Sequence, residues 1–237
     1  IDNFSAGRKE FMSRVEGNEK FTFVEGDLRT MDLNHLFQGV DVVCHMAANP
    51  DVRIGAENTS VHFDQNIMVT YRILEAMKNC KVGCILFPST SAIYGETTVV
   101  PTREDYGPLI PISLYGASKL SCEALIDSYC NTFDINGVIW RFANVVGTRS
   151  THNVLHDFIR KLNEDPGKLE ILGTSPGTWK SYIHVSDCVD AMITSAQKNT
   201  DLVGIYNIGS KDSISVLDIA DITVKEMGLC DVKYVWS

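Results

Sequence analysis

The stretch Gly83-Cys84-Ile85-Leu86-Phe87-Pro88 is apolar almost throughout, and three hydroxyl residues, Ser89-Thr90-Ser91, follow it directly. A short apolar run is typical of a β-strand that is covered on both faces, as in a parallel sheet. The run Asp41–Met46 has the same character. Ligands of open α/β sheets bind beyond the carboxyl ends of the strands, so we expect these hydroxyl groups to face a binding crevice. The alternative is a Ser/Thr-rich turn that only ends the strand.

Short β-rich runs alternate with longer helical patterns along the first 150 residues. Further candidate strands are Phe21–Glu25 and Gly137–Phe142, and helical patterns lie at about 55–79 and 113–133. Ser113 is a plausible N-cap for the second helix. This alternation predicts an α/β fold with a Rossmann-like, doubly wound parallel sheet.

The pattern changes after residue 150, where we expect a smaller C-terminal lobe interleaved with the end of the sheet. It comprises candidate helices at about 152–163, from Ser186 and from Ser215, and candidate strands at Leu169–Leu172, Lys180–Val185, Ile205–Ile208 and 234–237. We therefore predict two parts, residues 1–150 and 151–237.

Tyr115-Gly116-Ala117-Ser118-Lys119 opens the helical pattern at 113–133. A tyrosine and a lysine four residues apart lie on one face of a helix. The ammonium group favours the phenolate, so we expect the pKa of Tyr115 to fall from about 10 towards working pH. Such a base can take a proton from an alcohol while a cofactor takes the hydride. An exposed tyrosine stacked along the lysine is the alternative for the pair alone.

Composition excludes several classes of protein. The 237 residues are 44% hydrophobic and 22% charged, in the globular range. The net charge of −9 and the lack of a basic stretch argue against nucleic acid as the main partner. No apolar run is long enough to span a membrane, and no signal peptide is recognisable. The seven cysteines include no Cys-x-x-Cys pair, so we expect buried free thiols in the cytoplasm and no metal site.

Residues at other predicted strand ends suit a dinucleotide. Asp2 ends what looks like a strand already in progress, and a carboxylate there can accept hydrogen bonds from an adenosine ribose, which favours NAD. A simple turn former is the alternative for a lone Asp. Gly26-Asp27-Leu28 and Ala47-Ala48-Asn49 end the next two strands, where small residues let a flat cofactor approach the backbone.

Several short motifs in this order resemble the extended short-chain dehydrogenase/reductase superfamily, in particular its NAD-dependent nucleotide-sugar epimerases and dehydratases. The resemblance covers essentially the whole chain. It rests on Asp2-Asn3-Phe4-Ser5, Gly26-Asp27-Leu28, His45-Met46-Ala47-Ala48, Asn66, Ser89-Thr90-Ser91, Tyr115-Gly116-Ala117-Ser118-Lys119, Arg141-Phe142-Ala143-Asn144 and Tyr182-Ile183-His184-Val185-Ser186-Asp187.

The resemblance implies a role for each matching residue. Thr90 would orient the substrate hydroxyl, Tyr115 would be the base, and Lys119 would tune Tyr115 and hold the nicotinamide ribose. Asn66 would support the active-site backbone and contribute to the cofactor site, and Asn144 would contact the substrate diphosphate. The remaining NAD-binding residues would be Asp2, Asn3, Ser5, Asp27, Leu28, Ala47 and Ala48. Residues 1–150 would thus bind NAD and residues 151–237 mainly the substrate. His184 and His45 are expected to be structural.

The resemblance also separates epimerisation from dehydration. Sugar-nucleotide 4,6-dehydratases typically place an Asp-Glu pair after the catalytic threonine, where this chain has Ser91 and Ala92. Neither can act as an acid or base, so we predict 4-epimerisation, closest to UDP-glucose 4-epimerase. A dehydratase or related sugar-nucleotide enzyme is one alternative, and a non-catalytic dinucleotide-binding regulator is another. Many epimerases carry an arginine at the position of Lys180, which supplies the charge without the bidentate fork. The identities of the sugar and of the nucleotide base therefore stay open.

The two ends also differ from the family pattern. The resemblance implies a strand and a Gly-x-x-Gly-x-x-Gly loop before Asp2, and further residues beyond Ser237. We therefore expect both ends to be truncated and the chain to be a fragment, and the alternative is a chain that has lost its cofactor-binding start. Family resemblance also implies a homodimer formed through the helices at 55–79 and 113–133.

Overall fold

The computed structural model describes residues 1–237 as two compact units. One comprises Ile1–Phe142 and Met192–Asn207, and the other comprises Ala143–Ala191 and Ile208–Ser237. Each is described by itself below. The predicted division of binding roles at residue 150 stays a prediction.

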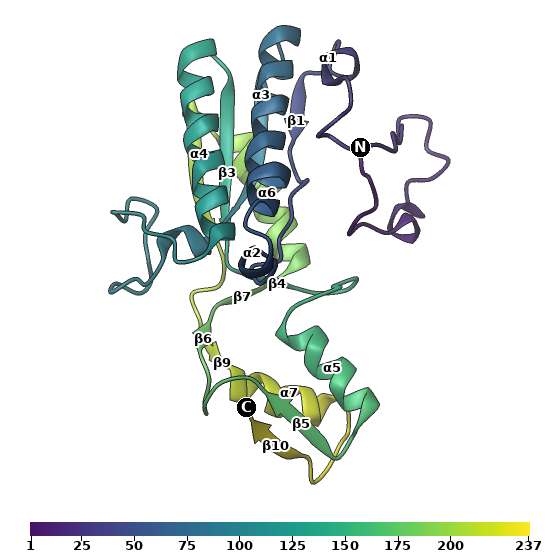
Figure 1. Cartoon of the computed structure of the whole chain (residues 1–237), viewed down its shortest axis with the longest axis vertical. Helices are drawn as coiled ribbons and strands as arrows, with labels where there is room; N and C mark the ends of the chain where they lie inside the picture. Colours follow the sequence, from purple (N-terminus) through teal and green to yellow (C-terminus); the bar gives the residue numbers. More distant parts are fainter. The chain divides into compact units, whose positions relative to one another are not determined.

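A four-stranded sheet forms the centre of the first unit (Figure 1). Its order is β1 (Val42–Cys44), β2 (Cys84–Thr90), β3 (Asn136–Phe142) and β8 (Val203–Ile208). β1, β2 and β3 run parallel in register. The amide nitrogens of Gly137 and Ala143 donate to the carbonyl oxygens of Leu202 and Ile208, in the same order along both chains, so β8 is parallel too. The predicted parallel α/β sheet is confirmed.

Helices cover both faces of this sheet. α3 (Met68–Cys80) and α4 (Leu114–Phe133) pack on one face, where Ile85 and Ile139 are fully buried in the main core. Trp140 points the other way, because neighbouring residues of a strand face opposite sides. Its Nε1 donates to Ser195 Oγ of α6 (Val185–Lys198) at 2.7 Å. The strands β2 and β3 are therefore buried on both sides, as their apolar sequences predict.

Three predictions about the first 80 residues are wrong. Phe21–Glu25 forms only an isolated bridge between Glu25 and Asp2, rather than a strand. β1 is an edge strand of the described sheet, so Val42 is 49% exposed instead of covered on both faces. The predicted helix at 55–79 is broken into α2 (Ile54–Glu57), a π-helix and α3; the bounds of the π-helix are Phe63–Ile67. Two short helices, Lys9–Met12 and α1 (Leu33–Leu36), complete this region.

The second unit has its own small core. α5 (Val154–Glu164) and α7 (Val216–Glu226) pack with the parallel pair β5 (Lys168–Ile171) and β10 (Lys233–Trp236). Ser215 begins α7 with a capping box, which satisfies free amide groups of its first turn.

Two further strand pairs belong to this unit. β4 (Asn144–Val146) pairs with β7 (Tyr182–His184), and β6 (Trp179–Lys180) pairs with β9 (Ile214–Ser215). The stretch predicted as a single strand, Lys180–Val185, is thus divided at Ser181.

The cysteines are all free, but only Cys122, Cys130 and Cys188 are buried. The expectation of uniformly buried thiols is wrong, because Cys44 lies on the edge strand and Cys230 on an exposed turn. No group of three or more His, Cys, Asp or Glu side chains is placed to hold a metal ion. No helix combines the length and hydropathy that a bilayer span requires.

Candidate active site

Thr90 and Tyr115 meet where β2 ends and α4 begins. The Thr90 hydroxyl accepts a hydrogen bond from the Ala92 amide at 3.2 Å, and its side chain lies close enough to the Tyr115 phenol to lower the pKa of that group. Ser113 caps α4 as predicted, since its hydroxyl accepts from the Gly116 amide at 3.0 Å. A Cβ atom on Gly116 would lie 2.8 Å from the Ala92 carbonyl oxygen, so the helix can begin this close to the turn only with glycine there. The close approach of α4 to the turn after β2 therefore brings Thr90 and Tyr115 together.

Lys119 lies one turn after Tyr115 and is almost fully buried, at 3% exposure. Its ammonium group donates to the Pro88 carbonyl oxygen at 2.8 Å and lies 4.4 Å from the centre of the Phe87 ring. Burial lowers the pKa of Lys119 to about 8. The lysine therefore ties α4 to the end of β2.

The expected fall in the pKa of Tyr115 is wrong for this structure. Burial raises the pKa of Tyr115 above its ordinary value, and the nearby Thr90 side chain only partly opposes that rise. Lys119 directs its ammonium group to the Pro88 carbonyl, not to the phenol. The spacing of the two residues was correct, but it did not reveal how deeply both are buried.

Asn66 connects the loop after β1 to the helix that carries Tyr115. Its Oδ1 accepts from the Asn49 amide at 2.8 Å, and its Nδ2 donates to the Asn49 carbonyl at 3.2 Å and to Ser118 Oγ at 2.9 Å. The Ser118 hydroxyl in turn donates to the Tyr115 carbonyl at 2.7 Å. The wider turns of the π-helix carry Asn66 here, in keeping with the frequent occurrence of such helices at functional sites.

Two histidines and a serine are also buried in this region. His45 is a core residue as predicted, because its Nε2 lies 2.9 Å from Thr70 Oγ1 and burial lowers its pKa to about 3. His62 was not singled out from the sequence, yet its ring is 5.7 Å from the Tyr115 ring and only 1% exposed. The sequence could have indicated His62, because it stands four residues before Asn66 and thus on the same face of a helix. His45 Nδ1, His62 Nε2 and Ser89 Oγ have no hydrogen-bond partner within the protein.

The predicted cofactor residues near the N-terminus form one polar cluster. Asn3 donates from Nδ2 to Asp27 Oδ2 at 3.2 Å and accepts from the Ser5 amide at 3.0 Å. The Asp2 carboxylate accepts from the Phe4 amide at 2.7 Å, as a turn former does, and remains exposed. Ala47 and Ala48 lie apart from this cluster, between β1 and the Asn49 that Asn66 holds.

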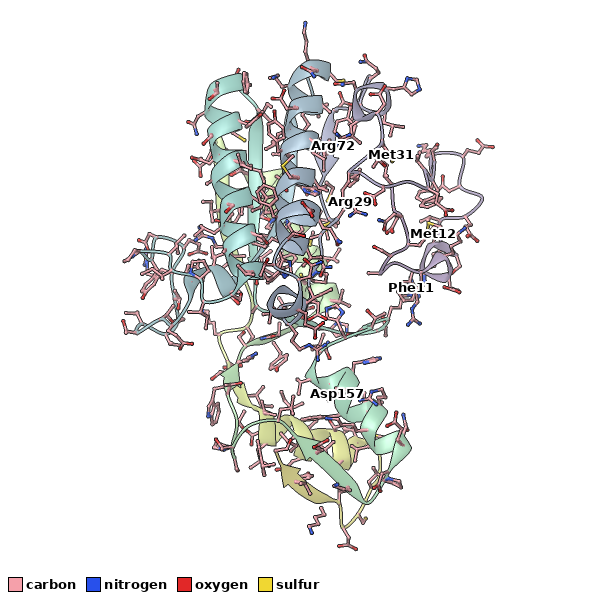
Figure 2. All side chains as sticks on the ribbon, in the orientation of Figure 1. Phe11, Met12, Arg29, Met31, Arg72 and Asp157 are labelled. Atoms are coloured by element: carbon pink, nitrogen blue, oxygen red, sulfur yellow. The ribbon has the colours of Figure 1, made fainter.

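Arginine side chains organise the turn that contains Asp27 and Leu28. Arg29 forks onto the Asp27 carboxylate, with Nη2 at 2.7 Å, and these bonds hold the pKa of Asp27 well below its ordinary value. Arg72 of α3 donates to the carbonyl oxygens of Leu28 at 3.0 Å and Met31 at 2.6 Å. Figure 2 shows the side chains of Arg29 and Arg72 in this region. Neither arginine was recognisable as a site residue from the sequence alone.

The remaining predicted residues lie in the second unit. The Asn144 amide side chain donates to the Ser181 carbonyl at 3.0 Å, which places Asn144 beside the residue after Lys180. Ser181 also accepts from the Ser210 amide at 2.9 Å, so it joins three segments. The Nδ1 atom of His184 lies 2.7 Å from Ser186 Oγ, and β7 pairs His184 with Val146 of β4. The structural role expected for His184 stays a prediction.

Comparisons with known proteins place this site in a family. The model of the NAD dependent epimerase/dehydratase family matches residues 2–209. The chain belongs to this family. It is 30% identical to a UDP-glucose 4-epimerase of Corynebacterium glutamicum, with 93% of this chain and 70% of that protein aligned.

Solved structures agree with that assignment. A UDP-galactose 4-epimerase, 35% identical, superposes with a TM-score of 0.86 over 100% of this chain and 76% of its own. The UDP-glucuronic acid 4-epimerase of Bacillus cereus, in complex with UDP-glucuronic acid and NAD, is 33% identical, with a TM-score of 0.86 over 95% of this chain and 71% of its own.

In this member of the epimerase/dehydratase family, the first unit joins the predicted catalytic residues into one connected cluster. Thr90 lies beside the Tyr115 phenol, and Asn66 reaches Tyr115 through Ser118. Lys119 binds the carbonyl two residues before Thr90. The predicted adenosine-binding residues form the separate cluster around Asp27.

Proposed function

We propose that the protein catalyses NAD-dependent 4-epimerisation of a nucleotide sugar of the UDP-glucose and UDP-galactose type. One arrangement carries the proposal: the Thr90 side chain lies close enough to the Tyr115 phenol to lower its pKa, and the two residues after Thr90 are Ser91 and Ala92. The site thus has a proton acceptor for an alcohol but no carboxyl groups at the positions that an elimination reaction would use.

Tyr115 is the proposed base. Thr90 would hold the 4-hydroxyl group of the sugar, and Tyr115 would take its proton as the hydrogen at C4 leaves with both bonding electrons. NAD, when bound, would supply the acceptor for that hydride, and rotation of the 4-keto sugar in the site would present its opposite face for the return of the hydride. Tyr115 would then give the proton back to O4, so atoms and electrons balance without net oxidation.

Lys119 would make that base available. Because burial raises the pKa of Tyr115, the phenolate needs a nearby positive charge. The ammonium group of Lys119, one turn away, is the nearest candidate on the same helix, and its pKa of about 8 keeps it largely charged at neutral pH. We propose that it stabilises the phenolate during the reaction and contacts the nicotinamide ribose.

The residues present suit a dinucleotide. Asp2 is exposed, so its carboxylate is open to the hydroxyl groups of the adenosine ribose. A Cβ atom on Gly7 would lie 2.7 Å from Asp2 Oδ2, so glycine there keeps the side of the carboxylate open. Asn3 and Ser5 shape this turn, and Asp27 and Leu28 would border the adenine. Ala47 and Ala48 would line the cofactor cleft, and Asn66 would hold the backbone of that cleft.

The substrate assignments belong to the same proposal. Asn144 and Lys180 would contact the diphosphate, with lysine supplying charge but no bidentate fork. A homodimer formed through α3 and α4 and a cytoplasmic location are also proposed. Residues 1–150 would bind mainly NAD and residues 151–237 mainly the substrate.

Incubation of the full-length protein with NAD and UDP-galactose tests the proposal, with UDP-glucose as the expected product. Tyr115→Phe should abolish most turnover and leave NAD binding intact, because it removes the phenolic proton acceptor alone. A stable 4-keto-6-deoxy product would identify a dehydratase instead. NAD binding without any sugar conversion would favour a regulator.

A further inference from the structure

Arg141 and Glu123 form a buried ion pair outside the residues assigned above. Both side chains are 5% exposed, and the Arg141 Nη2 atom is 2.8 Å from Glu123 Oε2. The Nε atom also donates to both carboxylate oxygens at 3.2 Å. A buried ion pair adds little net stability, because the loss of hydration offsets the attraction. The role of this ion pair is to connect β3, which carries Arg141, to α4, which carries Glu123.

The same guanidinium group binds the segment that follows Thr90. Its Nη1 atom donates to the Tyr94 hydroxyl at 2.9 Å and to the Glu104 carbonyl at 2.9 Å. Tyr94 ends the short 3-10 helix that begins directly after Thr90. Glu123 lies on α4, about two turns after Tyr115. One side chain of β3 therefore bonds to α4, which carries Tyr115, and to the last residue of the short helix that Thr90 caps.

The segment 95–112 is held at its middle by this cluster. The Tyr94 hydroxyl donates to Asn207 Oδ1 at 2.7 Å, and the Asn207 side chain donates to the Thr102 carbonyl at 2.9 Å. The Asn207 amide donates to Glu104 Oε1, also at 2.9 Å. These bonds fix the chain on both sides of Arg103, whose own side chain is 79% exposed.

The two ends of the segment also meet. Gly95 has a φ of +66°, and a Cβ atom there would collide with the Ile110 carbonyl oxygen. Between these ends, the segment exposes apolar residues such as Val100, at 82%. It leaves the body of the first unit between β2 and α4 (Figure 1). Its order therefore depends on the bonds at Thr102 and Glu104 rather than on a core of its own.

We propose that Arg141 is a positioning residue for Thr90 and Tyr115, and that it acts by clamping residues 95–112 through Tyr94 and Asn207. The positioning role rests on the proposed function. The clamp itself does not, because it consists of hydrogen bonds that exist without cofactor or substrate.

Trypsin cleavage after Arg103 measures the clamp directly. Tyr94→Phe keeps the ring beneath the guanidinium and removes the hydroxyl that bonds to both Arg141 and Asn207. Loss of hydrogen bonds to a buried charged cluster should raise the cleavage rate about tenfold. Asn207→Ala should act in the same way and serves as a second variant. Tyr106→Phe is the matched control, because the Tyr106 ring touches Tyr94 while its hydroxyl makes no hydrogen bond within the protein.

Turnover measures the positioning role. In Tyr94→Phe we expect kcat to fall about tenfold with KM unchanged, since misplacement of the catalytic pair weakens interactions of the transition state more than those of the bound substrate. Cleavage as slow as in the parent for both clamp variants would overturn the clamp. Faster cleavage with full kcat would overturn positioning. A parent protein that binds NAD but converts no sugar would overturn the proposed function and with it the positioning role, while cleavage would still decide the clamp.

Discussion

Asn66→Ala tests the hydrogen-bonded centre of the site. The substitution removes an amide that is 1% exposed and that bonds to Asn49 twice, to Ser118 once and to His62 Nδ1 at 3.3 Å. Alanine leaves the Asn49 amide and carbonyl without these partners, and frees Ser118 from the loop that follows β1. The π-helix itself can persist, because alanine is a good helix former.

The expected loss of stability follows from these bonds. Each intramolecular hydrogen bond contributes about 1 kcal/mol net, so the three bonds to Asn49 and Ser118 alone predict a decrease of about 3 kcal/mol in the free energy of unfolding. That is a large part of the roughly 5–15 kcal/mol of a typical domain. The same loss should reduce turnover, because Ser118 holds the Tyr115 carbonyl at 2.7 Å.

Urea unfolding followed by circular dichroism measures the difference. Asn131→Ala is the matched control: this asparagine lies exposed on α4 and its side chain bonds only within its own turn. We expect the control to stay within about 0.5 kcal/mol of the parent. An Asn66→Ala variant that loses less than about 1 kcal/mol would refute the idea that Asn66 ties the loop to α4.

Three further outcomes are expected. Burial holds the pKa of Lys119 near 8, below its ordinary 10.5, so the folded parent gains stability as the pH rises from 8 to 10.5. Lys119→Met should therefore be more stable than the parent at pH 7, by up to about 3 kcal/mol. Unfolding measured at several pH values should show this difference in stability shrinking as the pH rises. Ser113→Ala should lower the stability by about 1 kcal/mol through loss of the α4 cap, whereas Ser113→Asp should retain it. Leu169→Ala should destabilise the second unit by about 2–5 kcal/mol, while Leu172→Ala, at a site 73% exposed, should change its stability by less than about 0.5 kcal/mol, both measured by urea unfolding.

Local sequence was sufficient where local interactions decide the structure. The apolar run 83–88 became the buried strand β2, and Ser113 capped α4 as its side chain predicts. The spacing of Tyr115 and Lys119 placed both on one helix beside the end of β2. No strand forms at 21–25, because Glu25 alone of this run makes a β-bridge, with Asp2.

Long-range contacts account for what the sequence did not reveal. The break in the helix at 63–67 and the role of His62 depend on Asn66 reaching Ser118, 52 residues away. The raised pKa of Tyr115 depends on burial by segments distant in sequence, which spacing alone cannot report. The Arg141–Glu123 pair likewise joins residues of two elements that share no local pattern.

The bonds at Thr102 and Glu104 divide the segment 95–112 into an outer arm, residues 96–101, and an inner arm, residues 105–112. A change in the length of the outer arm would be taken up before residues 102–104, which are held in place, and so would not move the start of α4. Insertions are best tolerated at exposed tips of this kind, so residues 96–101 offer a place to graft a peptide or tag. A change of sequence at residues 96–101 can therefore alter this surface while the distance between Thr90 and Tyr115 stays the same.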